Sequence, residues 1–360
     1  MRIAIRADGS SFIGMGHVMR MLALAQALQR IGHEVIFLSR FEPGLIRIRQ
    51  QGFAVREVVG GLPDGANKDY EPAADTEAVC RILATEKFDC LVTDSYRVDS
   101  KCFQQVRSFV AASFYIDDLN RFPVAVDGVI NGNINAVELG YDDWPTATYR
   151  WLGCRYNLLR QEFADAPARL TADSVRNLLI VAGGGDAGQL LVFLINSLLE
   201  LAIAEQIALQ IVAPIHSLAD KDLTILAGNY PDRVKLHRGV TEMAQLMQQC
   251  DLAISAGGST LYELCATGVP RLAIVLADNQ QGIVAAMEQQ ELVVPLGAVT
   301  ELQPAFIAEQ VARLLNDWPK RDRMHRLGRK LVDGQGALRV AHKMAEVVAA
   351  AEGGQQREQT

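Results

Sequence analysis

Short apolar runs rich in β-branched residues alternate with longer segments of helical period along almost the whole sequence. In the first half, these strand-like runs fall at 2–7, 34–39, 53–59, 88–94, 113–118 and 127–131. A second series follows after a gap, at 175–184, 208–214, 234–239, 251–258, 271–277 and 292–297. Strands that alternate with helices are typical of parallel sheets covered by helices on both faces. The alternation therefore predicts an α/β protein with two doubly wound sheets.

The chain has 360 residues, which exceeds one ordinary domain of roughly 100–200 residues. Between Asn131 and Asp173 the periodicity fades and prolines stand among polar residues, as is typical of a connection between domains. We therefore expect an N-terminal Rossmann-like domain over 1–155 and a C-terminal one over 170–350. Two such domains should face a central cleft, because ligands of open α/β sheets bind outside the carboxyl ends of the strands.

Net charge and sequence motifs argue against several classes of binding partner. A formal net charge of −7 argues against a general nucleic-acid binder and requires any anion site to be local. The sequence shows neither a leader pattern nor an apolar run of the roughly 18–20 residues that span a bilayer, which predicts a cytoplasmic protein without membrane binding. No histidines have metal-ligand spacing, and Met19 replaces the third glycine of the dinucleotide fingerprint, so we expect neither metal nor cofactor. No feature indicates an obligate protein partner.

The strongest local signal is a buried strand pattern that ends in Gly257-Gly258-Ser259-Thr260, directly before a helical pattern. Unpaired N–H groups and the positive end of the helix should point at one place there. The glycines let a phosphate approach the backbone, and Ser259 or Thr260 can donate a hydroxyl. A tight turn with an ordinary Ser or Thr cap is the structural alternative. The complete four-residue string favours phosphate binding.

Two further groups of polar residues lie near this stretch. Glu263 falls one turn into the same helix, where its carboxylate could accept hydrogen bonds from both hydroxyls of a ribose. The alternative is a solvated glutamate that the helix dipole stabilises. Asn279 and Gln280 follow the next strand pattern, and their amides suit sugar hydroxyls or an acetamido group. Asp278 or Asn279 could instead simply cap the helix that follows.

His17 stands in the N-terminal stretch "IGMGHVMR", where a first strand gives way to a helical pattern over 17–32. A histidine in the first turn of a helix feels the positive helix end, which favours the neutral imidazole that a general base requires. Most lone histidines are structural, but the position after the first strand of the sheet favours catalysis. Gly14 and Gly16 would keep this loop thin enough for a substrate to approach.

Several strand ends in the N-terminal half carry polar residues. Asp94 and Tyr96 follow one strand pattern, and Asn133 lies near the domain connection. They could hold sugar hydroxyls or orient His17, although strand-end aspartates are also routine helix caps. Three more carboxylates could likewise serve the site or cap a helix, and they are Asp8, Asp117 and Asp118.

Five strings taken together resemble a known family: "IRADGSSFIGMGHVMRMLALA", "DDLNR", "YNLLRQEF", "SAGGSTLYELCATGVPRLAIVLADNQ" and "DGQGALRV". They are similar to the UDP-2,4-diacetamido-2,4,6-trideoxy-β-L-altropyranose hydrolases of pseudaminic acid biosynthesis, over about residues 2 to 340. That family is related in fold to the inverting two-Rossmann UDP-sugar glycosyltransferases, including the peptidoglycan N-acetylglucosaminyltransferase. The resemblance thus implies a glycosyltransferase-B-like architecture.

The resemblance also implies a reaction and a substrate. It implies a metal-independent hydrolase that cleaves the sugar C1–O bond of a UDP-linked amino-deoxy sugar and releases UDP. The family's catalytic histidine falls on His17, and its nucleotide-binding residues fall on Gly257 to Thr260 and on Glu263. One departure stands at Gly185, where the family commonly has a serine, so a contact from that hydroxyl is lost.

Three other functions remain open from the sequence. A UDP-sugar glycosyltransferase would use the same donor site with an acceptor hydroxyl in place of water. A non-hydrolysing UDP-sugar 2-epimerase shares the architecture but needs acid and base carboxylates that the sequence does not place. A module that only binds a nucleotide sugar would need no base at all.

Overall fold

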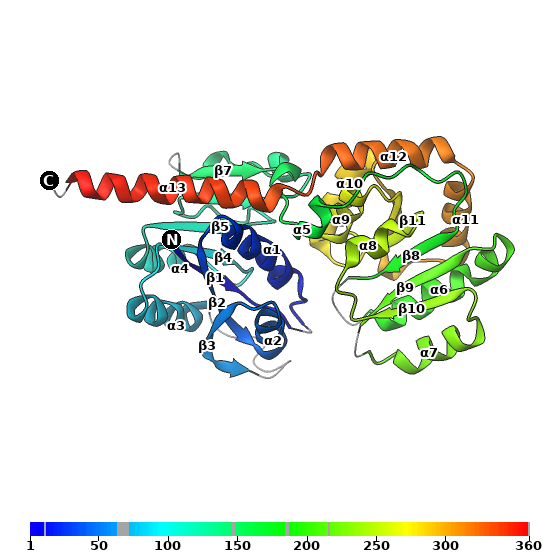
Figure 1. Cartoon of the computed structure of the whole chain (residues 1–360), viewed down its shortest axis with the longest axis horizontal. Helices are drawn as coiled ribbons and strands as arrows, with labels where there is room; N and C mark the ends of the chain where they lie inside the picture. Colours follow the sequence, from blue (N-terminus) through cyan, green and yellow to red (C-terminus); the bar gives the residue numbers. More distant parts are fainter. Residues whose placement is uncertain (11, 63–71, 146–147, 184–186, 215–216, 359–360) are drawn as a thin grey trace. The chain divides into compact units, whose positions relative to one another are not determined.

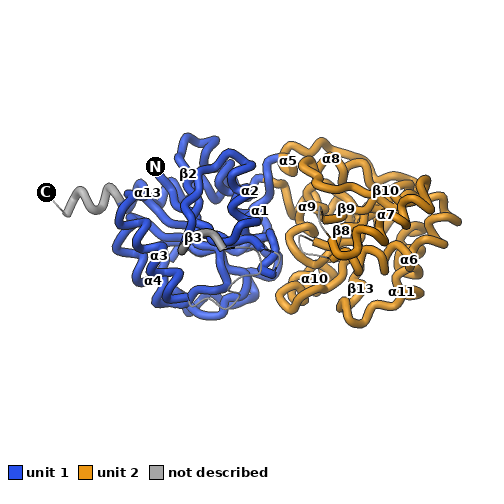
Figure 2. The backbone as a smooth tube through the Cα atoms, turned by 90° about the horizontal axis from the view of Figure 1, so that it is seen from below, with its two compact units in different colours: residues 1–161, 335–360 blue, residues 162–334 orange. Residues whose placement is uncertain are grey.

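The computed structural model describes residues 1–358 except 11, 63–71, 146–147, 184–186 and 215–216. The chain forms two compact units (Figure 2). Unit 1 comprises Met1–Gln161 and Gln335–Thr360, and unit 2 comprises Glu162–Gly334. Each unit is a parallel sheet between layers of helices (Figure 1).

Unit 1 contains a seven-stranded sheet in the order β3-β2-β1-β4-β5-β6-β7, and all of its described pairings are parallel. Its strands are β1 (Arg2–Ala7), β2 (Glu34–Phe41), β3 (Ala54–Leu62), β4 (Cys90–Asp94), β5 (Ala112–Ile116), β6 (Gly128–Asn131) and β7 (Tyr149–Leu152). Its α-helices are α1 (Gly16–Arg30), α2 (Glu42–Gln50), α3 (Pro72–Thr85), α4 (Ser100–Val106) and α13 (Gly336–Glu358). Short 3₁₀ turns are η1 (Arg107–Phe109), η2 (Ala136–Leu139), η3 (Tyr141–Asp143) and η4 (Cys154–Tyr156).

Side chains of β1 show why both faces of this sheet are covered. Ile3 and Ile5 belong to the core that includes α1 and α13, whereas Ala4 belongs to the core that includes α3. Successive side chains of a strand point to opposite faces, so a strand buried on both faces must be apolar throughout. This requirement explains the continuous apolar runs in the sequence.

Unit 2 repeats the arrangement with a six-stranded sheet in the order β10-β9-β8-β11-β12-β13. Its strands are β8 (Asn177–Val181), β9 (Ala208–Ala213), β10 (Val234–Arg238), β11 (Leu252–Ala256), β12 (Arg271–Val275) and β13 (Val294–Ala298). Its α-helices include α6 (Gly188–Ala204), α7 (Asp220–Asn229), α8 (Met243–Gln248), α9 (Thr260–Thr267), α10 (Gln281–Gln289), α11 (Pro304–Leu315) and α12 (Trp318–Leu331). The remaining elements are α5 (Gln161–Ala164) and the 3₁₀ turns η5 (Asp278–Gln280) and η6 (Val299–Glu301).

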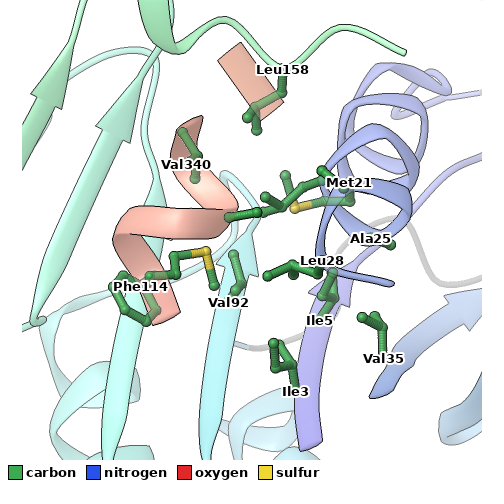
Figure 3. Packing of buried hydrophobic residues seen from close by; sticks show 14 of the residues in the cluster. Ile3, Ile5, Met21, Ala25, Leu28, Val35, Val92, Phe114, Leu158 and Val340 are labelled. Carbon is green, nitrogen blue, oxygen red and sulfur yellow. The ribbon is translucent and has the colours of Figure 1, made fainter. Parts of the chain in front are cut away.

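The last helix, α13, packs on unit 1 rather than on unit 2. It lies beside α1 (Figure 1), and Val340, Met344 and Val348 are fully buried in the core that includes Met21 and Leu28 (Figure 3). Burying each of these side chains contributes about 1.5–3 kcal/mol, which is ample to hold the helix there. Residues 335–350, which we expected in the second domain, therefore belong to unit 1.

The connection between the units also differs from the expectation. Strand β7 lies within the stretch 131–173 that shows no clear periodicity, and it pairs with β6 from Gly128↔Tyr149 to Asn131↔Leu152. Four residues are too few for a period-2 pattern to stand out. Unit 1 therefore continues to Gln161, a few residues beyond the expected boundary at 155.

Among the described residues, no helix has both the length and the apolar character needed to cross a membrane.

Candidate functional site

Strand order places the candidate site of unit 1 at one point of its sheet. Strand β1 pairs with β2 on one side and with β4 on the other, so the order of the sheet reverses between β1 and β4. Loops that leave the two strands at such a reversal diverge, and they leave a crevice at the carboxyl ends. His17 follows β1 in the first turn of α1, and Asp94 is the last residue of β4.

His17 and Asp94 form a buried pair at this point. Nδ1 of His17 lies 2.6 Å from Oδ1 of Asp94, and the two residues are 7% and 1% exposed. An ionised carboxylate only accepts hydrogen bonds, so Nδ1 of His17 donates to it. The other ring nitrogen, Nε2, then holds the lone pair of the neutral imidazole, as a general base requires.

Arg20 links this pair to a second carboxylate. Its Nε and Nη2 donate to Oδ2 and Oδ1 of Asp94, both at 2.6 Å, and its Nη1 donates to both oxygens of Asp118 at 2.9 and 2.8 Å. Asp118 also accepts from the Tyr96 hydroxyl at 2.6 Å and from Nδ2 of Asn133 at 2.9 Å. The Tyr96 ring meets the His17 ring edge-on, with centroids 4.7 Å apart.

The network keeps its carboxylates charged. Burial raises the pKa of Asp94, but Arg20 and His17 outweigh burial and hold that pKa well below its usual range. For Asp118, burial is again outweighed, chiefly by the charge of Arg20 and the hydrogen bond of Tyr96, so its pKa is also lowered. Burial lowers the pKa of Arg20, but the two carboxylates raise it well above the usual value.

A cavity of about 220 Å³ adjoins this network within unit 1. Its lining combines the polar groups of the site with an apolar edge, and it comprises Asp8, Phe12, Ile13, His17, Asp94, Ser95, Tyr96 and Arg97. Asp8 borders the cavity, but Arg6 binds its carboxylate through two hydrogen bonds of 2.7 and 2.6 Å. A space of this size can hold one sugar-sized ring beside His17.

The predicted loop glycines have different roles. Gly14 has a φ of +83°, a conformation that residues with a side chain rarely adopt, and it pairs with Ser10 in an isolated bridge. A Cβ at Gly16, the first residue of α1, would meet no atom of the described residues within 4 Å. Backbone conformation therefore requires the first glycine, whereas packing does not require the second.

Unit 2 has an equivalent reversal of strand order between β8 and β11. Gly257 to Thr260 follow β11 there, and α9 begins at Thr260. Within the described chain the Ser259 side chain makes no capping hydrogen bond, and Ser259 is exposed, so its hydroxyl can reach a ligand. The Leu261 and Tyr262 N–H groups of the first turn already donate to the carbonyls of Gly258 and Ser259, at 3.1 and 3.0 Å. Phosphate groups bind at such helix starts.

Of the three residues expected beside this loop, Gln280 lies against it. A Cβ at Gly257 would lie 2.6 Å from Val284 Cγ2 and 3.1 Å from Gln280 Cβ, so only glycine fits where the Gln280 side chain crosses. Oε1 of Gln280 accepts a hydrogen bond of 2.9 Å from the Leu276 N–H, which fixes the amide beside the loop. Asn279 is exposed in η5, and Glu263 is half-buried in α9. Gly185 lies outside the described residues.

The sequence analysis missed one member of the network, Arg20, and left the role of Asp117 open. Arg20 lies three residues after His17 and so on the same face of α1, a spacing that could have signalled their contact. Asp117 points elsewhere, because its carboxylate accepts hydrogen bonds from the Leu119 and Asn120 N–H groups and from the Tyr141 hydroxyl. Among the described residues, no cluster of three or more His, Cys, Asp or Glu side chains could hold a metal ion.

Part of unit 2 is similar in sequence to a known family. Residues 178–331 match the sequence family described as Glycosyltransferase family 28 C-terminal domain. The solved structure of glycosyltransferase VinC in complex with DTDP is similar over 97% of this chain and 100% of that chain, with a TM-score of 0.68 and 14% identity. The chain has the GT-B glycosyltransferase fold. The predicted class of two Rossmann-like α/β domains is thereby confirmed.

Two relatives share more sequence with this GT-B chain. The spore coat polysaccharide biosynthesis protein SpsG of Bacillus subtilis is 26% identical over 357 residues, which cover 94% of this chain and 96% of that protein. A Helicobacter pylori protein named as a pseudaminic acid cytidylyltransferase and UDP-2,4-diacetamido-2,4,6-trideoxy-β-L-altropyranose hydrolase is 26% identical over 198 residues. That match covers 53% of this chain and 35% of the Helicobacter protein. The match to SpsG thus extends over nearly the whole length of both chains, whereas the match to the Helicobacter protein spans about half of this chain.

Proposed function

We propose that this protein is a hydrolase that releases UDP from a UDP-linked 2,4-diacetamido-2,4,6-trideoxy-hexose, as a step of pseudaminic acid biosynthesis. The observation that carries the proposal is the hydrogen bond of 2.6 Å between His17 and Asp94 at the edge of a sugar-sized cavity. The named hydrolase activity of the Helicobacter relative supports the same substrate class. We propose that the protein works without a tightly bound metal and that it is located in the cytoplasm.

In the proposed reaction, His17 is the base and the loop from Gly257 to Thr260 binds the nucleotide. Nε2 of His17 removes a proton from a water molecule, and the water oxygen forms a bond to the anomeric carbon of the sugar. The bond between that carbon and the phosphate oxygen breaks, and UDP leaves with its electron pair. Asp94 stabilises the imidazolium that forms, because its carboxylate remains ionised beside Nδ1.

The leaving group needs stabilisation of its negative charge. We assign this task to Ser259, Thr260 and the positive end of α9, since helix starts bind phosphate. Glu263 is proposed to accept hydrogen bonds from the ribose, and Asn279 and Gln280 to contact the sugar or the phosphates. Tyr96 and Asn133 are proposed to shape the sugar site by holding Asp118.

A UDP-sugar glycosyltransferase is the second candidate. The glycosyltransferase family match of residues 178–331 and the similarity to VinC favour it. The same His17 would then remove the proton of an acceptor hydroxyl in place of water. The two candidates differ only in the nucleophile that reaches the anomeric carbon.

One assay separates the candidates. Purified protein is incubated with the UDP-sugar and no acceptor, and UDP release is followed over many turnovers. The hydrolase predicts sustained UDP release that is lost in the His17→Asn variant, whereas a transferase releases UDP only when an acceptor is added. Retention of UDP binding by the inactive variant would separate loss of chemistry from loss of fold.

A further inference from the structure

Arg20 lies between the carboxylate of Asp94, which contacts His17, and that of Asp118, whose charge also acts on the His17 ring. Three of its nitrogens donate to Asp94 and Asp118 at distances between 2.6 and 2.9 Å. Its Nη2 also lies 3.2 Å from Nδ1 of His17, so the guanidinium contacts His17 as well as both carboxylates. The side chains of Asp94 and Asp118 are 0% and 12% exposed, and water therefore screens these charges little.

The charged groups around the His17 ring come from four elements. The start of α1 contributes Arg20 and the positive helix end. The other groups come from the ends of three strands and comprise Asp8 after β1, Asp94, Tyr96 and Arg97 at the end of β4, and Asp118 after β5. Asp8 is already compensated by Arg6. When ionised, Asp94, Asp118 and Arg20 together carry one net negative charge.

We propose that Arg20 is the positioning residue that keeps His17 neutral and able to accept a proton, by compensating one of the two carboxylates whose charges act on it. The inference rests on the proposed role of His17 as the base. Arg20 acts through His17 and does not itself touch the reacting atoms.

A negative charge within about 4–6 Å of an imidazole stabilises its protonated form, and each such charge has a large effect in a buried site. Without Arg20 the charges of both carboxylates would act on the ring uncompensated, which would favour its protonated form. A protonated ring cannot accept a proton from water, so the base would be lost while the fold persists.

The test follows the ring of His17 directly, without substrate. The protein is labelled at its histidine rings, the His17 signals are assigned by their absence in His17→Asn, and their midpoint of change with pH is measured. Arg20→Gln should raise this midpoint by about one pH unit, whereas Asp118→Asn should lower it. The double variant Arg20→Gln with Asp118→Asn again has one net negative charge and should titrate near the wild-type midpoint. Arg20→Lys keeps the charge and should also stay near it.

A structural role for Arg20 predicts a different pattern. Loss of packing alone would lower the melting temperature of the variants without moving the midpoint in opposite directions. An unchanged or lowered midpoint in folded Arg20→Gln, or a double variant that does not return toward wild type, overturns the inference. If Arg20→Gln does not fold, an unchanged or raised midpoint in Asp118→Asn overturns it equally. Because no turnover is measured, these results test the role of Arg20 and not the hydrolase proposal. The assay of UDP release tests that proposal.

Discussion

Replacement of Asp94 by asparagine should uncouple catalysis from binding in this protein. Asp94 accepts three hydrogen bonds of 2.6 Å, from Nδ1 of His17 and from Nε and Nη2 of Arg20. An asparagine offers one oxygen and one NH₂ group, so its nitrogen would face a donor. With that nitrogen turned to His17, the ring would present its lone pair at Nδ1 and its proton at Nε2, and Nε2 could no longer accept a proton. We expect turnover per folded molecule to fall by about 10²–10⁴.

The same substitution should also cost stability. Removing one partner of a buried ion pair costs about 3–5 kcal/mol, and we expect the lower end of this range because Arg20 keeps its bonds to Asp118. The low pKa of Asp94 fixes the direction of the pH dependence. Its unfolded pKa is about 3.9, so its stabilisation is complete above about pH 5 and is lost as pH falls through the folded value. The difference in melting temperature between wild type and variant should therefore shrink below about pH 4.

A matched control is Asp251→Asn in unit 2. Asp251 also accepts hydrogen bonds from an arginine and from backbone N–H groups, but it lies before β11, at the opposite end of the strand from the glycine loop. This variant should lose stability and keep its turnover per folded molecule. Turnover of folded Asp94→Asn within threefold of wild type would refute the assignment of Asp94 as the group that orients His17.

Further predictions concern the nucleotide loop, the last helix and metal. Ser259→Ala and Glu263→Ala should each weaken UDP binding by roughly ten- to over a hundredfold, as one lost charged hydrogen bond implies, and equal UDP affinity in calorimetry would contradict the placement. Met344→Ala should destabilise unit 1 by about 2–5 kcal/mol because Met344 is fully buried, whereas replacement of the exposed neighbour His342 should change the melting temperature little. Dialysis against EDTA should leave UDP release unchanged, and its loss with recovery on adding Mg²⁺ would count against the mechanism.

The strands and the fold class could be predicted because a strand that is buried on both faces must be apolar along its whole length. Ile3 and Ile5 alternate with Ala4 toward two cores, and such runs are visible in any short window. The sequence does not show which core an amphipathic helix joins. The apolar stripe of α13 fits the face of α1 after the chain has passed through all of unit 2, and no local signal predicts this return.

The site was predictable only residue by residue. His17, Asp94, Tyr96 and Asn133 could be suggested because each follows a strand, where parallel sheets place their ligands. Their mutual contacts depend on strand order, which brings the ends of β1, β4 and β5 side by side from distant parts of the sequence. Arg20 was missed because an arginine on a helix is usually solvated, and only the fold places two carboxylates beside it.

The central claim is that a water molecule activated by His17 attacks the anomeric carbon. The most direct measurement is turnover of the UDP-2,4-diacetamido-2,4,6-trideoxy-hexose in H₂¹⁸O without acceptor, with both products analysed by mass spectrometry. We predict that ¹⁸O enters the released sugar and not UDP, and that folded His17→Asn, which still binds UDP, produces neither product at a comparable rate. Appearance of ¹⁸O in UDP, or wild-type turnover in the His17→Asn variant, would contradict the account.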